Sequence, residues 1–456
     1  MHATSPAVAM PDLSKDALRT EAASSTSLPL PGRLADVVAA AEHEAKLKAA
    51  QFRWDPITGR TTAPSSDQPR NPRRLNVLMT KGGKSLFYSL MDERVRLFWP
   101  GETVTEAPDI VVTTEPEKLA DDPLSLDLAG EVWQRLRSGA AKLLIDSSSE
   151  GYAFAPERFA RIDAALHAVG LGPSDCIYVT QHRGFRADYL AHRRALGLDG
   201  AGMDVLVHDR YIQYLFAAAL KPGPARFREQ LKAYAAAEAV RERRFISLNN
   251  KFRPVRMLFL LRLLQDGLWS SGYISLGKLY EFGGRAVSKP KLMQQLTVIE
   301  QLRPLAEQLT PLFEQLESYS PQYVGLEGRA PTRAADDLMI VPKMFEEYGQ
   351  SWFSIVLETD FSDRLHRITE KPFKPLLCFH PMILLGSCGS LGLIKQYGFS
   401  TFSGLFDESY DQEADPLARF EMVYEQVDRL CRMDEAELAQ RCDSVQEAWS
   451  SMPAGA

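Results

Sequence analysis

The sequence from residue 352 to residue 360 reads Trp352-Phe353-Ser354-Ile355-Val356-Leu357-Glu358-Thr359-Asp360. Its first part is a short and nearly continuous apolar run, which is typical of a β-strand buried on both faces. A second segment follows, reading Arg367-Ile368-Thr369-Glu370-Lys371-Pro372-Phe373-Lys374-Pro375. Thr369 is a suitable N-cap there, which would place Glu370 and Lys371 in the first turn of a helix. The pattern therefore predicts a buried strand, a loop and then a helix.

Apolar runs of the same character recur along the chain. They lie at residues 75–79, 109–113, 142–146, 176–180, 204–208, 245–248 and 381–385. Helical segments are expected at 157–169, 254–266 and 291–316, with one or two more helices after residue 407. Because strands alternate with helices, we expect an α/β fold with parallel sheets. The order favours two Rossmann-like domains facing each other across a cleft, and we find no internal repeat in the sequence.

Changes in composition set the expected domain boundaries. The first segment is rich in Ala, Ser, Thr and Pro, which is typical of a flexible tail, although one helix is plausible at 34–52. We therefore expect a flexible segment at 1–70, a first Rossmann-like domain at 71–235, a second at 236–425 and a helical tail at 426–456.

The bulk properties of the chain exclude several classes of protein. A formal net charge of −6 gives no global basic field, so we expect no nucleic-acid partner. The five cysteines are odd in number and lack metal-ligand spacing, which favours free thiols. No run approaches the ~20 apolar residues that span a bilayer, and the start of the chain does not resemble a secretory signal. We expect a cytoplasmic protein, with peripheral association with the inner membrane left open.

Two segments have the features of an anion site. At Thr369 to Lys371, a helix amino end would offer free N–H groups, and the lysine would add a full positive charge. The alternative there is an ordinary capped helix. At 244–256 a strand, a polar loop and a helix beginning at Pro254 follow one another, and Arg256 would point toward the carboxyl edge of the sheet. A guanidinium suits phosphate oxygens, whereas the alternative is a solvated basic face.

The segment Thr369-Glu370-Lys371 resembles the donor-binding motif of α-1,3-fucosyltransferases, in which these residue types follow a strand in the C-terminal domain. The continuation at 380–387 is similar to the next strand of that family. A wider set of bacterial sugar-transferase-like proteins shares more of the run, including Gly389-Ser390-Leu391, Tyr397-Gly398-Phe399 and Asp407-Glu408-Ser409-Tyr410-Asp411. The resemblance covers residues 244–425.

This resemblance implies a glycosyltransferase of the GT-B architecture, acting in polysaccharide biosynthesis or protein glycosylation. The donor would be a UDP- or GDP-linked sugar, with no further cofactor, and the acceptor a glycan, a lipid-linked sugar or a protein. Glu370 would hold the ribose, while Lys371 and Arg256 would contact the diphosphate. The remaining donor-binding candidates are Thr369, Arg253 and Asn249.

A transferase that inverts the anomeric centre needs a general base. Asp146 and Glu150 follow the predicted strand at 142–146 and are the candidates, although aspartate at a strand end is also a common turn or capping residue. His182 and His208 are weaker candidates, and a packed histidine is the alternative for each.

Other chemistries find less support in the sequence. Glu358 and Asp360 have the spacing of a divalent-metal pair, but the neighbouring lysine could neutralise the same charge, so we expect metal-independent chemistry. The glycine turn at 81–85 lacks the first glycine of a phosphate-binding loop. A kinase or phosphatase is therefore disfavoured, whereas a non-catalytic binding protein on the same scaffold remains an alternative.

Overall fold

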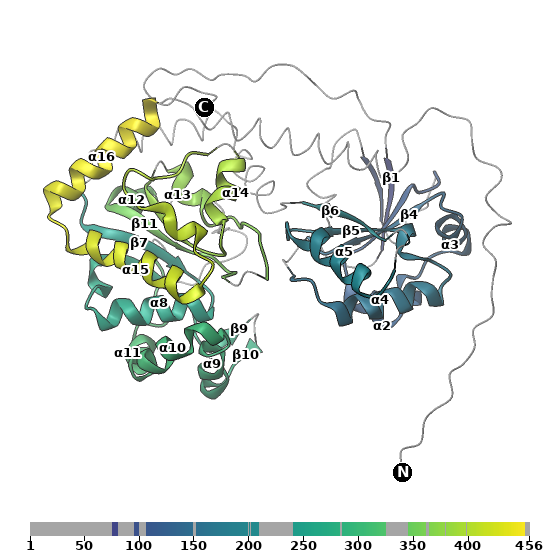
Figure 1. The fold of residues 1–456 in the computed structure, drawn as a ribbon, viewed down its shortest axis with the longest axis horizontal. Helices are drawn as coiled ribbons and strands as arrows, with labels where there is room; N and C mark the ends of the chain where they lie inside the picture. Colours follow the sequence, from purple (N-terminus) through teal and green to yellow (C-terminus); the bar gives the residue numbers. More distant parts are fainter. Residues whose placement is uncertain are drawn as a thin grey trace, which may run out of the picture.

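A computed structural model describes residues 75–80, 95–99, 106–148, 152–198, 200, 202–208, 240–282, 285–324, 345–361, 364–378, 380–397 and 399–451. These residues form a mixed α/β protein with two parallel sheets, which lie in two separate lobes in Figure 1. The expected flexible segment, the helix at 34–52 and the turn at 81–85 lie outside the described residues.

The first lobe is built on a sheet of six described strands in the order β2-β1-β3-β4-β5-β6, all parallel. Its strands are β1 (Leu75–Met79), β2 (Val95–Phe98), β3 (Ile110–Thr113), β4 (Lys142–Asp146), β5 (Cys176–Thr180) and β6 (Asp204–Val207). Its helices are α2 (Pro116–Asp121), α3 (Gly130–Arg137), α4 (Pro156–Ala168) and α5 (Phe185–Ala195), with the 3₁₀ turns η3 (Pro123–Leu126) and η4 (Pro173–Asp175). Every residue of β3 and β5 is buried, as their continuous apolar runs predict.

The second lobe is built on a sheet of four described strands in the order β12-β11-β7-β8, also parallel. These are β7 (Arg243–Asn249), β8 (Gly272–Leu276), β11 (Ser351–Leu357) and β12 (Met382–Leu385), beside a small antiparallel hairpin of β9 (Glu281–Phe282) and β10 (Arg285–Ala286). The helices are α8 (Pro254–Gln265), α9 (Lys289–Leu296), α10 (Arg303–Leu309), α11 (Phe313–Ser318), α12 (Phe345–Gly349), α13 (Phe373–Leu377), α14 (Ser390–Gln396), α15 (Pro416–Arg432) and α16 (Glu435–Ser451). The 3₁₀ turns are η5 (Trp269–Ser271), η6 (Glu300–Leu302), η7 (Thr310–Leu312) and η9 (Glu408–Gln412).

The two sheets share one strand order. In each, the second strand along the chain lies outside the first, and the third and fourth strands extend the sheet on the other side. The chain therefore reverses its direction of winding between β1 and β3 in the first lobe and between β7 and β11 in the second. Such a reversal opens a crevice at the carboxyl ends of the strands, where ligands bind in open α/β sheets.

The helix expected at 291–316 is wrong as a single element. The structure breaks it into α9, η6, α10, η7 and α11. Pro304 lies in the first turn of α10 and Pro311 in the first turn of η7. Proline has no backbone N–H and clashes with the preceding turn, so each proline begins a new element instead of continuing the old one.

The expected boundary at residue 425 falls inside α15, which runs from Pro416 to Arg432. Val423 and Val427 of this helix are fully buried, and they belong to the same hydrophobic core as Phe245 and Phe353 of the sheet. One or two helices are expected after residue 407, and the described residues there form two α-helices, α15 and α16. They belong to the second lobe instead of forming a tail of their own.

Two further expectations concern the whole chain. All five cysteines are free, as predicted. Among the helices that the structure describes, none combines the length and apolar character that a bilayer crossing needs.

Candidate functional site

Polar side chains follow the carboxyl ends of β7 and β11, where the chain reverses its direction of winding. Asn249 ends β7, and Glu358 directly follows the last residue of β11. The amino end of α8, which begins at Pro254, lies at the same edge because α8 follows β7 after a short loop. Gly277 lets β8 approach this loop, since a Cβ atom there would lie 2.0 Å from the carbonyl oxygen of Asn250.

Arg256 of α8 points to the carboxyl edge, as the sequence predicts. Its Nε donates to the carbonyl of Leu357 at 2.9 Å, and its Nη2 donates to the hydroxyl of Thr359 at 3.1 Å. Nη1 donates to the carbonyl of Lys251 at 3.3 Å. Burial lowers the pKa of Arg256 to about 10, which the charge of Glu358 opposes, so the side chain is a buried cation at neutral pH. It joins α8 to the end of β11.

The other two candidates on this side differ in exposure. Arg253 is half-buried and is the N-cap residue of α8. Asn249 is 1% exposed, and its Nδ2 donates to the hydroxyl of Ser247 at 3.0 Å. Its Oδ1 is buried and has no hydrogen-bond partner among the described residues.

The expected N-cap at Thr369 is wrong. Helix α13 begins at Phe373 with Pro372 as its N-cap, so Glu370 and Lys371 lie in the preceding loop. Thr369 is instead held by the buried carboxylate of Glu358, which accepts hydrogen bonds from the N–H of Thr369 at 3.0 Å and from its hydroxyl at 2.7 Å. Glu358 also accepts the N–H of Thr359 at 2.9 Å. The positive end of a helix is therefore not what prepares this loop for an anion.

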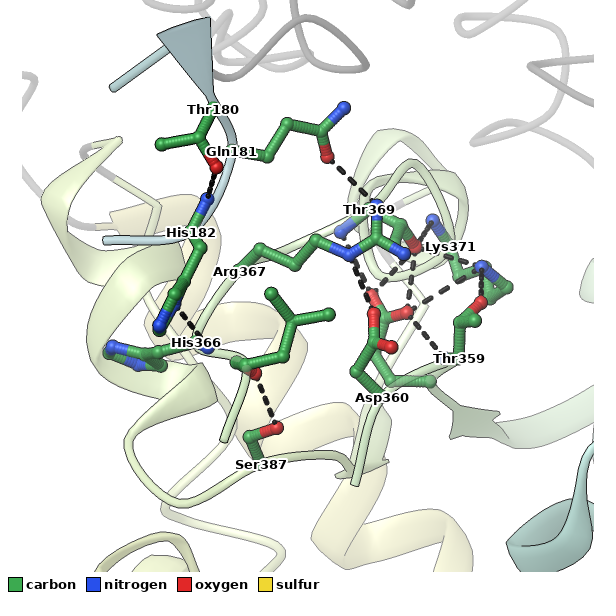
Figure 2. A network of polar contacts seen from close by, with 12 residues as sticks. Thr180, Gln181, His182, Thr359, Asp360, His366, Arg367, Thr369, Lys371 and Ser387 are labelled. Atoms are coloured by element: carbon green, nitrogen blue, oxygen red, sulfur yellow. Dashed lines mark hydrogen bonds and ion pairs between the residues drawn. The ribbon is translucent and has the colours of Figure 1, made fainter. Parts of the chain in front are cut away.

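Lys371 is directed back toward β11 by the same arrangement (Figure 2). Its Nζ donates to the hydroxyl of Thr369 at 2.9 Å and to that of Thr359 at 3.1 Å, and it lies 3.5 Å from Glu358. Since Arg256 donates to the same Thr359 hydroxyl, two cations from distant segments converge on one oxygen atom. The lysine side chain is 19% exposed, so an outside anion can reach it.

Glu370 is close to Lys371, with 3.5 Å between Oε1 and Nζ. Burial by itself would raise the pKa of its carboxyl, but the charges of Lys371 and Lys374 outweigh burial and lower the pKa to about 2. A hydroxyl-rich ligand would find in Glu370 a carboxylate that stays ionised at all ordinary pH values.

The depressed pKa of Glu370 predicts a pH dependence of stability. Because the folded carboxyl titrates near 2 and the unfolded one near 4.5, its contribution is fully present above about pH 4.5 and is lost as the pH falls toward 2. The shift corresponds to at most about 3 kcal/mol. Urea unfolding of Glu370→Gln and of the unchanged protein at pH 6 and pH 3 measures it: the stability difference between the two proteins should shrink at pH 3. A difference that stays constant with pH would contradict the assignment.

A small pocket opens beside this loop on one face of the second sheet. Its floor is apolar, with Ile246 and Val356 among the strand residues that line it, and Tyr348 forms one wall. Lys371 and Lys374 lie at the same pocket from the side of α13. The lining of the pocket is therefore mainly apolar, with two lysine residues at its edge.

The acidic pair Glu358 and Asp360 is already bound by protein groups. Glu358 holds Thr369, and Asp360 accepts Nε of Arg367 at 2.6 Å. Among the described residues no group of three or more His, Cys, Asp or Glu side chains has the arrangement of a metal site.

The candidates for a general base lie in the first lobe. Asp146 ends β4 and is 0% exposed, and its Oδ1 accepts the N–H of Ser148 at 2.9 Å and the hydroxyl of Ser148 at 2.6 Å. This is the turn arrangement named above as the alternative for Asp146. Glu150 lies outside the described residues. His208 is buried at the end of β6, so its imidazole does not face solvent.

The carboxyl edges of the two sheets are in contact (Figure 2). The loop after β5 begins with Gln181, whose Oε1 accepts Nη1 of Arg367 at 3.1 Å, and Gln181 itself donates to the carbonyl of Ser148. The next residue, His182, accepts the N–H of His366 at Nδ1 (3.0 Å), while its Nε2 lies 3.2 Å from Asp188. His182 thus acts as a packed residue at the junction of the lobes.

Arg419 of α15 binds the backbone at the carboxyl edge of the second sheet. It is 1% exposed, and its guanidinium donates to the carbonyls of Gly386 at 3.1 Å and Phe361 at 2.9 Å, and to that of Glu413. Gly386 directly follows β12, and Phe361 lies in the loop after β11. One buried arginine therefore fixes the backbone after two neighbouring strands.

Neither a protein-family model nor a curated protein matches the sequence. Among solved structures, the chain is similar to a crystal structure of an α1,3-fucosyltransferase, with 10% sequence identity and a TM-score of 0.35. The match covers 87% of this chain and 96% of that one. At such a TM-score the likeness supports no conclusion about this protein.

Sequence reasoning missed three residues of this region. Gln181 and Arg367 have no local signal, because each becomes important only through contact with the other lobe. Arg419 is one of four basic residues in an acidic C-terminal region, where a solvated position is the usual expectation. An arginine on the buried face of an amphipathic helix was the only signal for it.

Proposed function

We propose that the protein is a glycosyltransferase of the GT-B type that takes its sugar from a UDP- or GDP-linked donor held by the second lobe. The acceptor, a glycan, a lipid-linked sugar or a protein, would be held by the first lobe, and no metal would be required. The observation that supports this most is the convergence of Arg256 and Lys371 on Thr359 at the crevice of the second sheet. Both side chains are hydrogen-bond donors that suit phosphate oxygens, and the carboxylates of Glu358 and Glu370, each 3.5 Å from the Lys371 ammonium, hold that ammonium in place.

Each candidate residue has a defined task in this proposal. Lys371 and Arg256, with Arg253 at the rim, would offset the negative charge that grows on the diphosphate as the sugar leaves. Glu370 would accept hydrogen bonds from the ribose hydroxyls. Thr369 would position Lys371. The Oδ1 atom of Asn249, which has no hydrogen-bond partner among the described residues, would accept a hydrogen bond from the nucleotide sugar.

The general base is a choice between Asp146 and Glu150. Asp146 could remove a proton from an acceptor only after its turn with Ser148 opens, because the carboxylate is enclosed in the present structure. This enclosure favours the second candidate function, a non-catalytic protein that binds a nucleotide sugar or a glycan on the same scaffold. Donor hydrolysis or transfer by the purified protein separates the two functions.

A ligand screen tests the donor site. Thermal unfolding is measured with UDP, GDP and CMP and with their sugar conjugates. A ligand present at about 100 times its Kd should add about 2.7 kcal/mol to the free energy of unfolding. The shift should disappear in Lys371→Ala and persist in Lys395→Ala, which removes an exposed lysine of the same lobe paired with Glu408.

Two results would count against the proposal. If no nucleotide shifts the folded protein, the transferase function is wrong. If the shift survives in Lys371→Ala and in Arg256→Lys, a nucleotide binds elsewhere on the chain.

A further inference from the structure

The segment from Leu365 to Lys371 contacts both lobes. The N–H of His366 donates to Nδ1 of His182 at 3.0 Å, and its carbonyl accepts the N–H of Arg183 at 2.9 Å. At the other end of the segment, Glu358 holds Thr369 and lies beside Lys371. One short stretch of backbone therefore joins the first lobe to the proposed donor site.

A chain of side chains runs parallel to this backbone (Figure 2). Arg367 is 5% exposed, and its guanidinium donates to Asp360 in the second lobe at 2.6 Å and to Gln181 in the first lobe at 3.1 Å. Gln181 is 0% exposed and also donates to the carbonyl of Ser148 after β4. Polar contacts are thus continuous from Ser148 through Gln181 and Arg367 to Asp360.

The two lobes meet in this chain through one buried hydrogen bond, from Arg367 to Gln181. If the first lobe moved away, both side chains would lose that hydrogen bond and would have to bind water instead. A planar guanidinium holds both partners in fixed directions, which a flexible ammonium group would not do. A displacement of the first lobe would therefore move Arg367 and, with it, the segment that carries Lys371.

We propose that Gln181 and Arg367 are positioning residues that couple ligand binding in the two lobes. With the first lobe in place, Arg367 holds its segment so that Lys371 faces the diphosphate. A bound diphosphate in turn holds the first lobe in place, so the acceptor binds more tightly to the donor-loaded protein. The factor by which the donor raises the affinity for the acceptor equals the factor by which the acceptor raises the affinity for the donor. The identity of the two ligands rests on the proposed function, whereas the coupling between the lobes does not.

The first test measures the affinity of the nucleoside diphosphate by titration calorimetry in Gln181→Ala. This substitution lies in the other lobe from the proposed donor site, yet we expect it to weaken binding about 5-fold or more. Gln181→Glu keeps an acceptor for Arg367 but loses the amide that donates to the Ser148 carbonyl, so it should restore only part of the affinity. The matched control is Gln134→Ala, which removes an exposed glutamine of α3 in the same lobe that has no part in the chain of contacts. It should bind within about 2-fold of the unchanged protein.

A second test needs no ligand. Hydrogen–deuterium exchange of the Thr369 and Lys371 amides, whose N–H groups donate to Glu358 and to the Thr369 hydroxyl, reports the order of the segment. Exchange should be faster in Gln181→Ala and unchanged in Gln134→Ala. Equal exchange in Gln181→Ala and the unchanged protein, or equal acceleration in both variants, would overturn the coupling. If no nucleoside diphosphate binds, the proposed function fails, and this exchange measurement still decides whether the lobes are coupled.

Discussion

Lys371→Ala is expected to lower kcat/KM for the donor reaction about 10²- to 10³-fold, the usual loss when one preorganised donor to a developing negative charge is removed. The side chain is 19% exposed and converges with Arg256 on Thr359, so its positive charge faces the crevice. Steady-state kinetics with the donor from the ligand screen measures the effect. Lys371→Arg keeps the positive charge and should retain more activity than the alanine variant.

The loss in Lys371→Ala should arise from chemistry and binding, with folding largely preserved. Glu358 keeps its hydrogen bonds from Thr369 and Thr359 in that variant, so we expect the thermal midpoint to fall by only a few degrees. Lys395→Ala is the control for loss of a lysine from the second lobe. Full activity in Lys371→Ala would remove this lysine from the mechanism.

Glu358→Ala is expected to be the most destabilising of the substitutions considered, at about 3–5 kcal/mol. The carboxylate is 4% exposed and accepts hydrogen bonds from Thr369 and Thr359 while compensating the charge of Lys371. Its removal leaves the buried N–H and hydroxyl of Thr369 and the partly buried N–H of Thr359 without this acceptor, and it removes one of the two carboxylates beside Lys371. Urea unfolding monitored by circular dichroism measures the loss.

Two comparisons sharpen the Glu358 result. Glu358→Gln keeps an oxygen acceptor for Thr369 but loses the charge opposite Lys371, so it should cost less than the alanine variant. Glu437→Ala removes a half-exposed carboxylate of α16 paired with Arg441 and should change stability by less than about 1 kcal/mol. Equal urea midpoints for Glu358→Ala and Glu437→Ala would mean that Glu358 does not hold the loop.

The fold was predictable where burial on both faces leaves a continuous apolar run. The run at 142–146 coincides with β4, and the runs for β1 and β5 coincide as well. Two described strands of the parallel sheets gave no such run. β2 is only four residues long and includes an arginine, and β8 alternates glycine, tyrosine and serine with its apolar residues. Short mixed strands such as these are specified by their neighbours in the sheet more than by their own residues.

The candidate site was predictable only in part, because sequence shows which residues are near a strand end but not what they contact. Arg256 could be placed, since its position follows from a strand, a short loop and the first turn of a helix. Thr369 could not, because its partner Glu358 is 11 residues away and the competition between a helix cap and a buried carboxylate is decided by tertiary structure. The contact of Gln181 with Arg367 spans 186 residues and depends on how two lobes meet.

The position of Arg419 late in the chain has a consequence for folding during translation. Arg419 is 58 residues beyond Phe361, whose carbonyl it binds. At translation rates of 5–20 residues per second, the backbone after β11 waits roughly 3 to 12 s for the side chain that fixes it. In the later part of that interval, once β12 (Met382–Leu385) has been made, the strands of the second lobe lack their last covering helices, so the nascent chain exposes apolar strand residues. Slow codons between β12 and α15 would lengthen this exposure, and codon usage there should influence the yield of soluble protein more than codon usage in the first lobe.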